Sequence, residues 1–527
     1  MTGTTWKEHS PLNAEASPAK DQGVKAPTPP GQEAQGGVFI YAHSQYRGPL
    51  LAVGRRLKER DGLHVRLYVN TRQKEAFYRD RACPRDVSEV HRLRHLHEFL
   101  SEPPPADVVA RARAMEQRLG ITVNELRLSN RHLGRAFALS GTRHPRSHFS
   151  EQASFPHILN AYTRFVEQWE EEIARWRPRL VIYPDNTLEA VCRAHGIPTA
   201  YLCGARHRNH HYWSPDGRFS CQEIRDTFRN LCTNPPAEPP PETEAAKEPE
   251  ETTARPYKGH MDTRVVFLRE SSLKGTLSKL ALALLRHLYW TVRGYDKSKG
   301  YLLRDTLMNH INVWRDTRFL TNPTNTLSVR DLEGRKFIFY PLQTDPEAAL
   351  QGLSPDYFFQ LETIAAIARC LPADVSLVVK ETFWAVGRRP QDFYRHLAEF
   401  KNVILAHMLD LGPDVISRSL GVVTITGTAA LEATTLGRPA VVMGKGLFFA
   451  EQDAIVEAQT IDQLTEAVQR MARGEFDPQH IRQQAQVMLR AIERVGFDMG
   501  SFNALAPDTV TEDAIEGAYA ALKRGFF

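Results

Sequence analysis

The sequence predicts an α/β protein with two Rossmann-type, doubly wound layers. Two blocks of the 527-residue chain, one starting near Val38 and one at Arg335, alternate short apolar strands with helices. Strand–helix–strand units of this length are almost always parallel and right-handed. The length suggests roughly two to four domains. With 42% apolar and 24% charged residues, the composition is typical of a soluble globular protein that can bury a sizeable core.

The first block, residues 37–232, is expected to be an N-terminal Rossmann-like domain. Residues 1–36, which precede it, have few large apolar side chains, so burial could not offset the entropy of ordering them and we expect a disordered tail. Residues 86–175 have a mostly helical pattern. The other expected elements are a strand at Val38–Tyr41, a helix through Leu50–Leu57, a strand at His64–Val69 and a strand–helix–strand unit over 180–202.

Two segments separate the blocks. Residues 233–260 are rich in proline and acid and are expected to form a solvated linker. Residues 261–333 are expected to be a helical connector, in which the stretch LSKLALALLRHLYWTVRGYDKSKG is apolar on one side and basic toward its end. Such a helix either packs against its own domain or lies on a membrane surface.

The second block, residues 334–480, is expected to be a C-terminal Rossmann-like domain, followed by C-terminal helices over 481–527. Five parallel strands separated by short helices make a doubly wound sheet. The five strands are expected at 336–342, 375–381, 402–406, 421–427 and 439–444.

Within this block, the stretch TITGTAALEATTLGRPAVVMG places one acid inside a predicted helix whose other residues are uncharged. Ligands of a doubly wound sheet bind at the carboxyl ends of its strands. Gly427 permits the backbone to approach a phosphate closely, and the hydroxyls of Thr426 and Thr428 are further donors. Glu432 could accept hydrogen bonds from the two hydroxyls of a ribose. The alternative is that Thr426 only caps the helix and Glu432 pairs with a base such as Arg438.

Polar side chains also follow two other strands of this block. A lysine and an arginine near a phosphate site can neutralise the charge that develops on a departing nucleotide diphosphate. Each such residue alone is more often a solvated surface residue, but three consecutive strand ends with such groups favour a functional site. The sequence therefore predicts Lys380 and Arg388 as catalytic residues, and Gln343, Asp345 and Glu381 as donor-binding residues.

In the first block, His43 and Asp185 each follow a strand, at positions expected to face a cleft between two domains. Either residue could act as a base on an acceptor hydroxyl. For Asp185, a plain turn role is the alternative. A separate loop contains His207, His210 and His211, but no cysteine or second ligand cluster accompanies them, so we predict no metal site.

Charge and cysteine patterns exclude several classes of protein. A net charge of +5 without a long Lys/Arg block does not fit a nucleic-acid binder. The six cysteines contain no C-x-x-C pair, which favours reduced structural thiols. The N-terminus lacks the apolar core of a signal peptide, and no apolar run approaches the roughly 18 residues of a spanning helix. We therefore expect a cytoplasmic protein with at most a peripheral association with the inner membrane.

The stretches FIFYPLQTDPEAAL, LVVKETFWAVGRRPQDFYRHL, NVILA and TITGTAALEATTLGRPAVVMG lie between Phe337 and Gly444. Together they resemble the capsule polysaccharide biosynthesis glycosyltransferases, a bacterial family that includes the Kdo transferases of capsule export systems. The resemblance implies a GT-B architecture, in which two Rossmann-like domains face a cleft. It also implies an N-terminal acceptor domain, a nucleotide-sugar held mainly by the C-terminal domain, and no obligatory metal or other cofactor. Gly427, Thr428 and Glu432 would then be donor-site residues.

The chain departs from the family pattern at two histidines. Where family members often have K-E-H-P or K-P-H-P, this chain continues from Lys380 and Glu381 to Thr382 and Phe383. The histidine of the family's P-L-H-x-Q-P-E stretch is replaced by Gln343. A missing histidine could mean a different donor sugar or lost catalysis.

These patterns predict a glycosyltransferase that moves a sugar from a nucleotide-sugar donor to a bacterial capsule, another surface polysaccharide or a lipid-linked acceptor. Its expected partners include the polysaccharide export machinery. One alternative is a nucleotide-sugar epimerase of the same fold. Another is a catalytically degenerate binding or scaffold subunit of a polysaccharide assembly complex, which would bind the donor without turnover.

Overall fold

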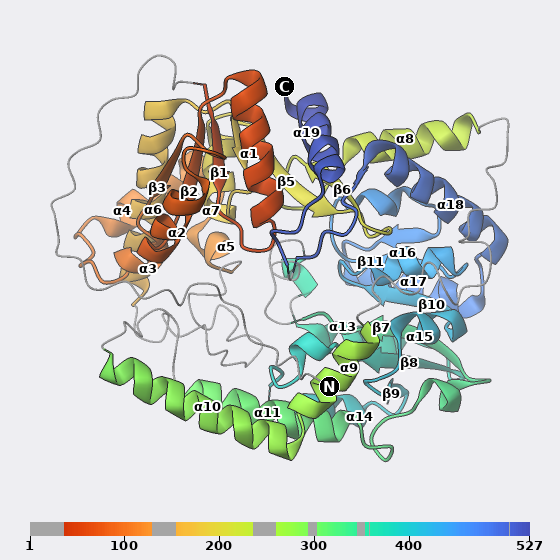
Figure 1. Ribbon diagram of the computed structural model, residues 1–527. Coiled ribbons are helices and arrows are strands. Elements are labelled where there is room, and N and C mark those ends of the chain that lie inside the picture. The colour runs from red at the N-terminus through yellow and green to blue at the C-terminus, as the bar shows by residue number, and fades with distance from the viewer. Residues whose placement is uncertain are drawn as a thin grey trace, which may run out of the picture. The chain divides into compact units, whose positions relative to one another are not determined.

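The computed structural model describes residues 36–128, 154–235, 260–293, 303–344, 354–357, 359–390, 392–504 and 506–527. The chain folds into two compact units. The first comprises Met1–Ile121, Phe155–Leu202 and Met499–Phe527, and the second comprises Thr122–Ser154 and Cys203–Asp498. Each unit has helices packed around parallel strands (Figure 1), which confirms the predicted α/β class.

A parallel sheet forms the centre of the first unit, with its strands in the order β3-β2-β1-β4-β5. Read by chain position, this is the third, second, first, fourth and fifth strand, the order of the Rossmann fold. Val38 lies opposite both Val65 and Leu180, so the first strand is central. The strands are β1 (Val38–Tyr41), β2 (Val65–Val69), β3 (Glu89–Arg92), β4 (Leu180–Ile182) and β5 (Thr199–Gly204), which runs into the second unit.

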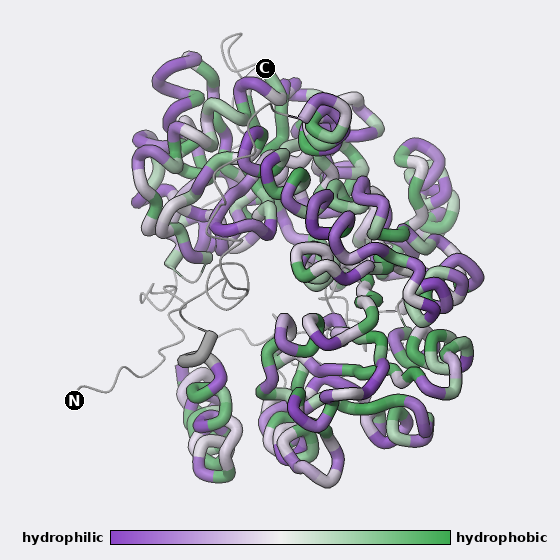
Figure 2. Tube along the Cα trace, turned by 90° about the vertical axis from the view of Figure 1, so that its right-hand side faces the viewer, coloured by the Kyte–Doolittle hydropathy of each residue, from purple (hydrophilic) through white to green (hydrophobic). Residues whose placement is uncertain are grey.

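Helices pack on this sheet. Along the tube in Figure 2, hydrophobic and hydrophilic residues alternate through the helical turns of the molecule. The longest, α6, buries Tyr162 and Trp169, and the last helix of the chain packs on α1 through ion pairs such as Arg56 to Glu516 at 2.8 Å. The helices are α1 (Arg47–Asp61), α2 (Arg72–Ala82), α3 (Leu96–Phe99), α4 (Val108–Leu119), α6 (Phe155–Trp176), α7 (Asn186–Ala194) and α19 (Glu512–Phe526).

Six strands of the described part of the second unit form a parallel sheet in the order β12-β11-β10-β7-β8-β9. Read from β9, this is again the third, second, first, fourth, fifth and sixth strand, the complete order of a Rossmann sheet. The strands are β7 (Lys336–Pro341), β8 (Val375–Lys380), β9 (Val403–Leu405), β10 (Gly421–Thr424), β11 (Ala440–Val442) and β12 (Ile455–Glu457). Strands β6 (His210–Ser214), which neighbours β5, and β13 (Phe497–Asp498) form an antiparallel pair.

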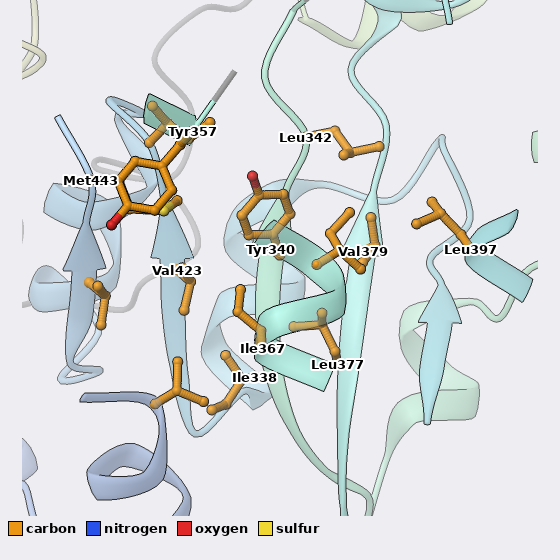
Figure 3. Close-up of a cluster of buried hydrophobic side chains, with 14 of the residues drawn as sticks. Ile338, Tyr340, Leu342, Tyr357, Ile367, Leu377, Val379, Leu397, Val423 and Met443 are labelled. Atoms are coloured by element: carbon orange, nitrogen blue, oxygen red, sulfur yellow. The ribbon is translucent and has the colours of Figure 1, made fainter. Parts of the chain in front are cut away.

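One hydrophobic core cluster of the second unit lies against one face of its sheet (Figure 3), and residues such as Phe339 and Val378 are buried on the other face. Ile338 of β7, Leu377 of β8 and Val423 of β10 are inaccessible to solvent and pack with Ile367 of α13. Continuous apolar runs of this kind are typical of parallel strands buried on both faces. The helices of this unit are α5 (Val123–Leu128), α8 (Gln222–Thr233), α9 (His260–Glu270), α10 (Leu273–Val292), α11 (Leu303–Leu320), α13 (Gln360–Cys370), α14 (Phe393–Glu399), α15 (Gly412–Arg418), α16 (Ala429–Thr435), α17 (Ile461–Arg473) and α18 (Pro478–Val495).

The observed organisation differs from the predicted one in four respects. Strand β3 lies inside the segment 86–175 that reads as helical, and β12 adds a sixth strand to the five that were expected. The predicted strand 421–427 ends early, because β10 stops at Thr424 and a turn follows. The unit boundaries also differ from the predicted ones, since α8 packs on α18 in the second unit and α19 packs on α1 in the first.

Candidate functional site

The strand order of the second sheet reverses between β7 and β10, where β8 and β9 extend one side and β11 and β12 extend the other. In open α/β sheets, ligands bind outside the carboxyl ends of the strands at this switch point. The two segments that leave these strand ends are 342–344 and 425–428. The topology therefore places Gln343 and the Thr426–Thr428 turn where this fold holds its ligands.

Hydrogen bonds among three residues connect the two strand ends. The Gln343 side-chain amide donates to Thr424 Oγ1 at 3.1 Å, and the Gly427 backbone N–H donates to the same oxygen at 3.2 Å. A Cβ atom at position 427 would lie 2.5 Å from Thr424 Oγ1 and 3.2 Å from Gln343 Nε2. The backbone at Gly427 therefore approaches these two side chains closely, and the position has no room for a larger residue. The predicted approach to a phosphate stays a prediction.

Glu432 lies half-buried on α16, one turn beyond Gly427. Burial raises the pKa of its carboxyl group above the ordinary value, while a hydrogen bond with the Thr428 hydroxyl and the positive charge of Arg206 act to lower that pKa. Arg438 is not its partner, because the Arg438 guanidinium donates to the backbone carbonyl of Ser417 at 2.6 Å. Thr428, and not Thr426, is the N-cap residue of α16, so the capping role predicted for Thr426 is wrong. The base near Glu432 is Arg206.

Arg206 is the residue of this site that the sequence did not reveal. It follows β5 with a left-handed backbone (φ +63°), an unusual conformation for a non-glycine residue. Its Nη1 donates to the Thr426 carbonyl at 2.5 Å, and its guanidinium lies 5.7 Å from the centre of the Phe449 ring. It therefore brings a cation to the turn that precedes Glu432. Its only signal in the sequence is a basic residue in the histidine-rich run ARHRNHHYW.

Glu381, predicted to bind the donor, is instead enclosed in a hydrogen-bonded network with 1% of its surface exposed. Its carboxylate accepts from Arg389 Nε at 2.7 Å, Arg389 Nη2 at 2.9 Å, the Tyr394 hydroxyl at 2.8 Å and the Thr382 N–H at 2.8 Å. Arg389 Nη2 also donates to the Gln343 carbonyl at 2.6 Å. Glu381 and Arg389 are thus positioning residues, which fix the strand end that presents Gln343.

Lys380 and Arg388 have surroundings different from those of Glu432. Burial lowers the pKa of the Lys380 ammonium to about 8, while the carboxylates of Asp410 and Glu381 act to raise that pKa and Arg264 of α9 acts to lower it. Arg388 lines a cavity of about 230 Å³ whose other walls include Lys279 of α10 and residues of α9 and α11. Both predicted catalytic cations therefore lie toward α9, α10 and α11. Predicted donor residue Asp345 lies outside the described residues.

The switch point of the first sheet, between β1 and β4, holds His43 and Tyr183. Their ring centres are 4.2 Å apart, and Tyr183 has a left-handed backbone with φ +61°. Burial, and then the charge of Lys74, lower the pKa of His43 to about 4. Among the described residues, no atom hydrogen bonds to His43 Nδ1, although it is buried. A neutral imidazole with a free nitrogen has the chemistry of a base.

Asp185 serves as the N-cap of α7 and accepts a hydrogen bond from the Leu188 N–H at 2.9 Å. Burial raises the pKa of its carboxyl group. This contact favours the turn role over the catalytic role for Asp185. It leaves His43 as the better candidate for a base in the first unit.

The histidine-rich loop makes contacts within the second unit. His207 Nε2 lies 2.9 Å from a carboxylate oxygen of Glu493, and His211 Nδ1 lies 2.9 Å from the Asn209 carbonyl. The part of the chain that the structure describes contains no group of three or more His, Cys, Asp or Glu side chains arranged to hold a metal ion. All six cysteines are free thiols. Over the same residues, no helix has both the length and the apolar character needed to cross a membrane.

No protein-family model and no curated protein matches this chain. Similar solved structures include the UDP-GlcNAc 2-epimerase from Neisseria meningitidis bound to UDP-GlcNAc (10% identity over 93% of this chain and 99% of that chain, TM-score 0.23). Another is an α,α-trehalose 6-phosphate synthase from Burkholderia multivorans (12% identity over 87% of this chain and 95% of that chain, TM-score 0.32). A third is a β-Kdo 2,4-transferase from Thermosulfurimonas dismutans (13% identity over 55% of this chain and 79% of that chain, TM-score 0.25). Because these identities and TM-scores are low, the strand orders described above, and not these likenesses, identify the fold.

Proposed function

We propose that the protein is a glycosyltransferase that binds a nucleotide-sugar at the β7–β10 switch point of its second unit. The observation that carries this proposal is that a half-buried acid, Glu432, lies within the electrostatic influence of a cation, Arg206, which donates to the turn that leaves β10. In this proposal the Glu432 carboxylate accepts hydrogen bonds from the ribose hydroxyls. The Arg206 guanidinium neutralises the diphosphate, because its planar fork matches phosphate oxygens.

The supporting residues have distinct roles in the proposal. Gln343 and Gly427 set the spacing between the two strand ends, and the Thr428 hydroxyl orients the Glu432 carboxylate. His43 is the proposed base on the acceptor hydroxyl, because its imidazole is neutral at physiological pH and its buried Nδ1 has no hydrogen-bond partner among the described residues. With Arg206 in place, the proposed reaction does not call for a metal ion.

The acceptor in this proposal is a bacterial capsule, another surface polysaccharide or a lipid-linked acceptor, and the export machinery is a proposed partner. These assignments rest on the family resemblance of residues 337–444 alone. The scaffold alternative is supported by the replacement of the two family histidines at Gln343 and Thr382. The epimerase alternative would use the same nucleotide site without an acceptor.

Binding of the donor is tested by the thermal stability of the full chain with CMP, UDP, GDP and dTDP and their sugar forms. A nucleotide at a hundred times its dissociation constant should stabilise the native state by about 2.7 kcal/mol. We expect one nucleotide class to do so, and Glu432→Gln to weaken its binding by about tenfold to a hundredfold, because hydrogen bonds to a carboxylate are lost. Glu466→Gln removes an exposed acid from α17 and is the matched control.

The outcomes separate the candidate functions. No stabilisation by any nucleotide, or equal losses in Glu432→Gln and Glu466→Gln, would contradict the proposed site. Binding followed by transfer of the sugar to a saccharide acceptor supports the transferase. Binding with interconversion of the free nucleotide-sugar supports the epimerase, and binding without any product supports the scaffold.

A further inference from the structure

The face of α10 that points away from its neighbours is apolar and exposed. Thr276 and Ala283 are its buried residues, and the helix packs on α9 and α11. With 3.6 residues per turn, the leucines at 273, 277, 284 and 288 fall in one stripe about a quarter turn from this packed side. Leu285 and Val292 lie opposite the packed side. The exposed large apolar residues of α10 are Leu273, Leu277, Leu282, Leu284, Leu285, Leu288, Tyr289 and Val292.

The exposed fractions of these apolar side chains are large. Leu285 is 64% exposed, Leu288 is 60% exposed and Val292 is 78% exposed. Contiguous apolar surface on a folded protein marks a site of interaction with another protein, a ligand or a membrane. The charges around the stripe distinguish between these partners.

The charges on α10 are all positive. The helix contains Lys274, Lys279 and Arg286 and no Asp or Glu, and Arg293 follows as its C-cap. Lys279 pairs with Glu270 at 2.7 Å. Lys274 and Arg286 are exposed, Lys274 next to the leucine stripe and Arg286 next to Leu282 at the other edge of the exposed apolar face. A second copy of this helix would bring cations against cations across the leucines, which disfavours self-association.

Aromatic side chains accompany the cations at the C-terminal end of α10. The Arg286 guanidinium lies 6.0 Å from the centre of the Trp290 ring, and the Arg293 guanidinium lies 5.6 Å from that of Tyr289. An apolar stripe flanked by Lys, Arg, Trp and Tyr is the pattern of helices that lie in the interface of an anionic bilayer. The helix is already folded and N-capped by Ser272, which accepts from the Gly275 N–H at 3.1 Å, so its ordering adds no cost to binding.

We propose that α10 docks the protein on the surface of a membrane that contains anionic lipids. The leucine stripe would enter the boundary between headgroups and acyl chains, and Lys274, Arg286 and Arg293 would meet lipid phosphates. This inference is independent of the nucleotide site. It gives this helix a membrane role in addition to its packing on α9 and α11.

The test is cosedimentation of the full chain with vesicles of phosphatidylcholine alone and of phosphatidylcholine mixed with phosphatidylglycerol. We expect binding to the mixed vesicles, which weakens with added salt. Leu284→Glu/Leu288→Glu should lower this affinity by at least about tenfold, since two apolar side chains leave the bilayer. Lys274→Gln/Arg286→Gln should lower it by about fivefold per charge.

The matched control is Val109→Glu/Ile461→Glu, which changes two exposed apolar residues on α4 and α17, at 57% and 41% exposure. It should bind the mixed vesicles as the unchanged protein does. Because all four substituted apolar side chains are exposed, each variant should keep the unfolding midpoint of the unchanged protein. Failure of the unchanged protein to bind mixed vesicles would overturn the proposal, as would equal binding to both kinds of vesicle. A concentration-dependent dimer that Leu284→Glu/Leu288→Glu abolishes, without vesicle binding, would assign the stripe to a second copy instead.

Discussion

Arg389 donates from both Nε and Nη2 to the two carboxylate oxygens of Glu381, at 2.7 and 2.9 Å, with both side chains buried. The same Nη2 reaches the Gln343 carbonyl, and Gln343 in turn bonds Thr424. This chain of contacts joins the ends of β8, β7 and β10, which are neighbours in the sheet. An ion pair that is inaccessible to water thereby supports the segments of the proposed nucleotide site.

Removing Arg389 should destabilise the protein strongly. Arg389→Met leaves the Glu381 carboxylate buried without its cation, and we expect a loss of about 3–5 kcal/mol in the free energy of unfolding. Arg388→Met, at the adjacent position on a cavity wall, is the control and should cost much less. The measurement is denaturation in urea. Because the penalty comes from the unpaired charge, the double variant Glu381→Leu/Arg389→Met should recover part of the lost free energy of unfolding. Equal losses of stability in Arg388→Met and Arg389→Met would contradict the network.

Gly427 should not tolerate a side chain. In Gly427→Ala the new methyl group would lie 2.5 Å from Thr424 Oγ1, and overpacking of this kind costs about 1–3 kcal/mol. The same change should weaken nucleotide binding, because the turn must move away from Gln343. Gly412→Ala is the control, since a Cβ at position 412 meets no atom within 4 Å. The double variant Thr424→Ala/Gly427→Ala lacks the obstructing oxygen and should regain part of the stability. If Gly427→Ala and Gly412→Ala lose the same free energy of unfolding, the turn has room for a methyl group.

The buried ammonium of Lys380 should make stability rise with pH in the alkaline range. Its pKa is about 8 in the folded protein, against an ordinary value of 10.5. Between these pH values the unfolded chain holds a proton that the folded chain has released, so the free energy of unfolding increases with pH. We expect the difference in stability between the unchanged protein and Lys380→Met to grow in favour of the unchanged protein from pH 8 to pH 10.5. Urea denaturation at several pH values measures it, and a difference that stays constant over this range would contradict the lowered pKa.

His43 should make stability fall in acid. Its pKa is about 4 in the folded protein, against an ordinary value of 6.5. The imidazole is neutral in both states above pH 6.5, and between pH 6.5 and pH 4 only the unfolded chain takes up the proton, so stability is lost as the pH falls. His43→Gln should remove this part of the loss, whereas His396→Gln, at an exposed position on α14, should not. If both variants follow the acid unfolding curve of the unchanged protein, His43 is not held neutral by burial.

The alternation of apolar and polar residues determined the α/β class, the two layers and most of the strands. Strand ends are also readable, because polar residues follow apolar runs wherever a strand leaves the core. The sequence thus located the turns that contain His43, Gln343 and Gly427 before any strand order was known. Short strands such as β3 (EVHR) were not readable, because four residues with a single buried side chain carry too little pattern.

Only the tertiary structure decided which side chains share a site. Arg388 and Arg389 are adjacent and chemically identical, yet one lines a cavity and the other is buried against Glu381. Arg206 precedes Glu432 by more than two hundred residues, and a left-handed residue after β5 aims it at the turn beyond β10. Local pattern fixes which residues lie on one face of an element, because helical and strand periods act over a few positions. Partners contributed by distant elements are set by the order in which the strands assemble, and that order is a property of the folded chain.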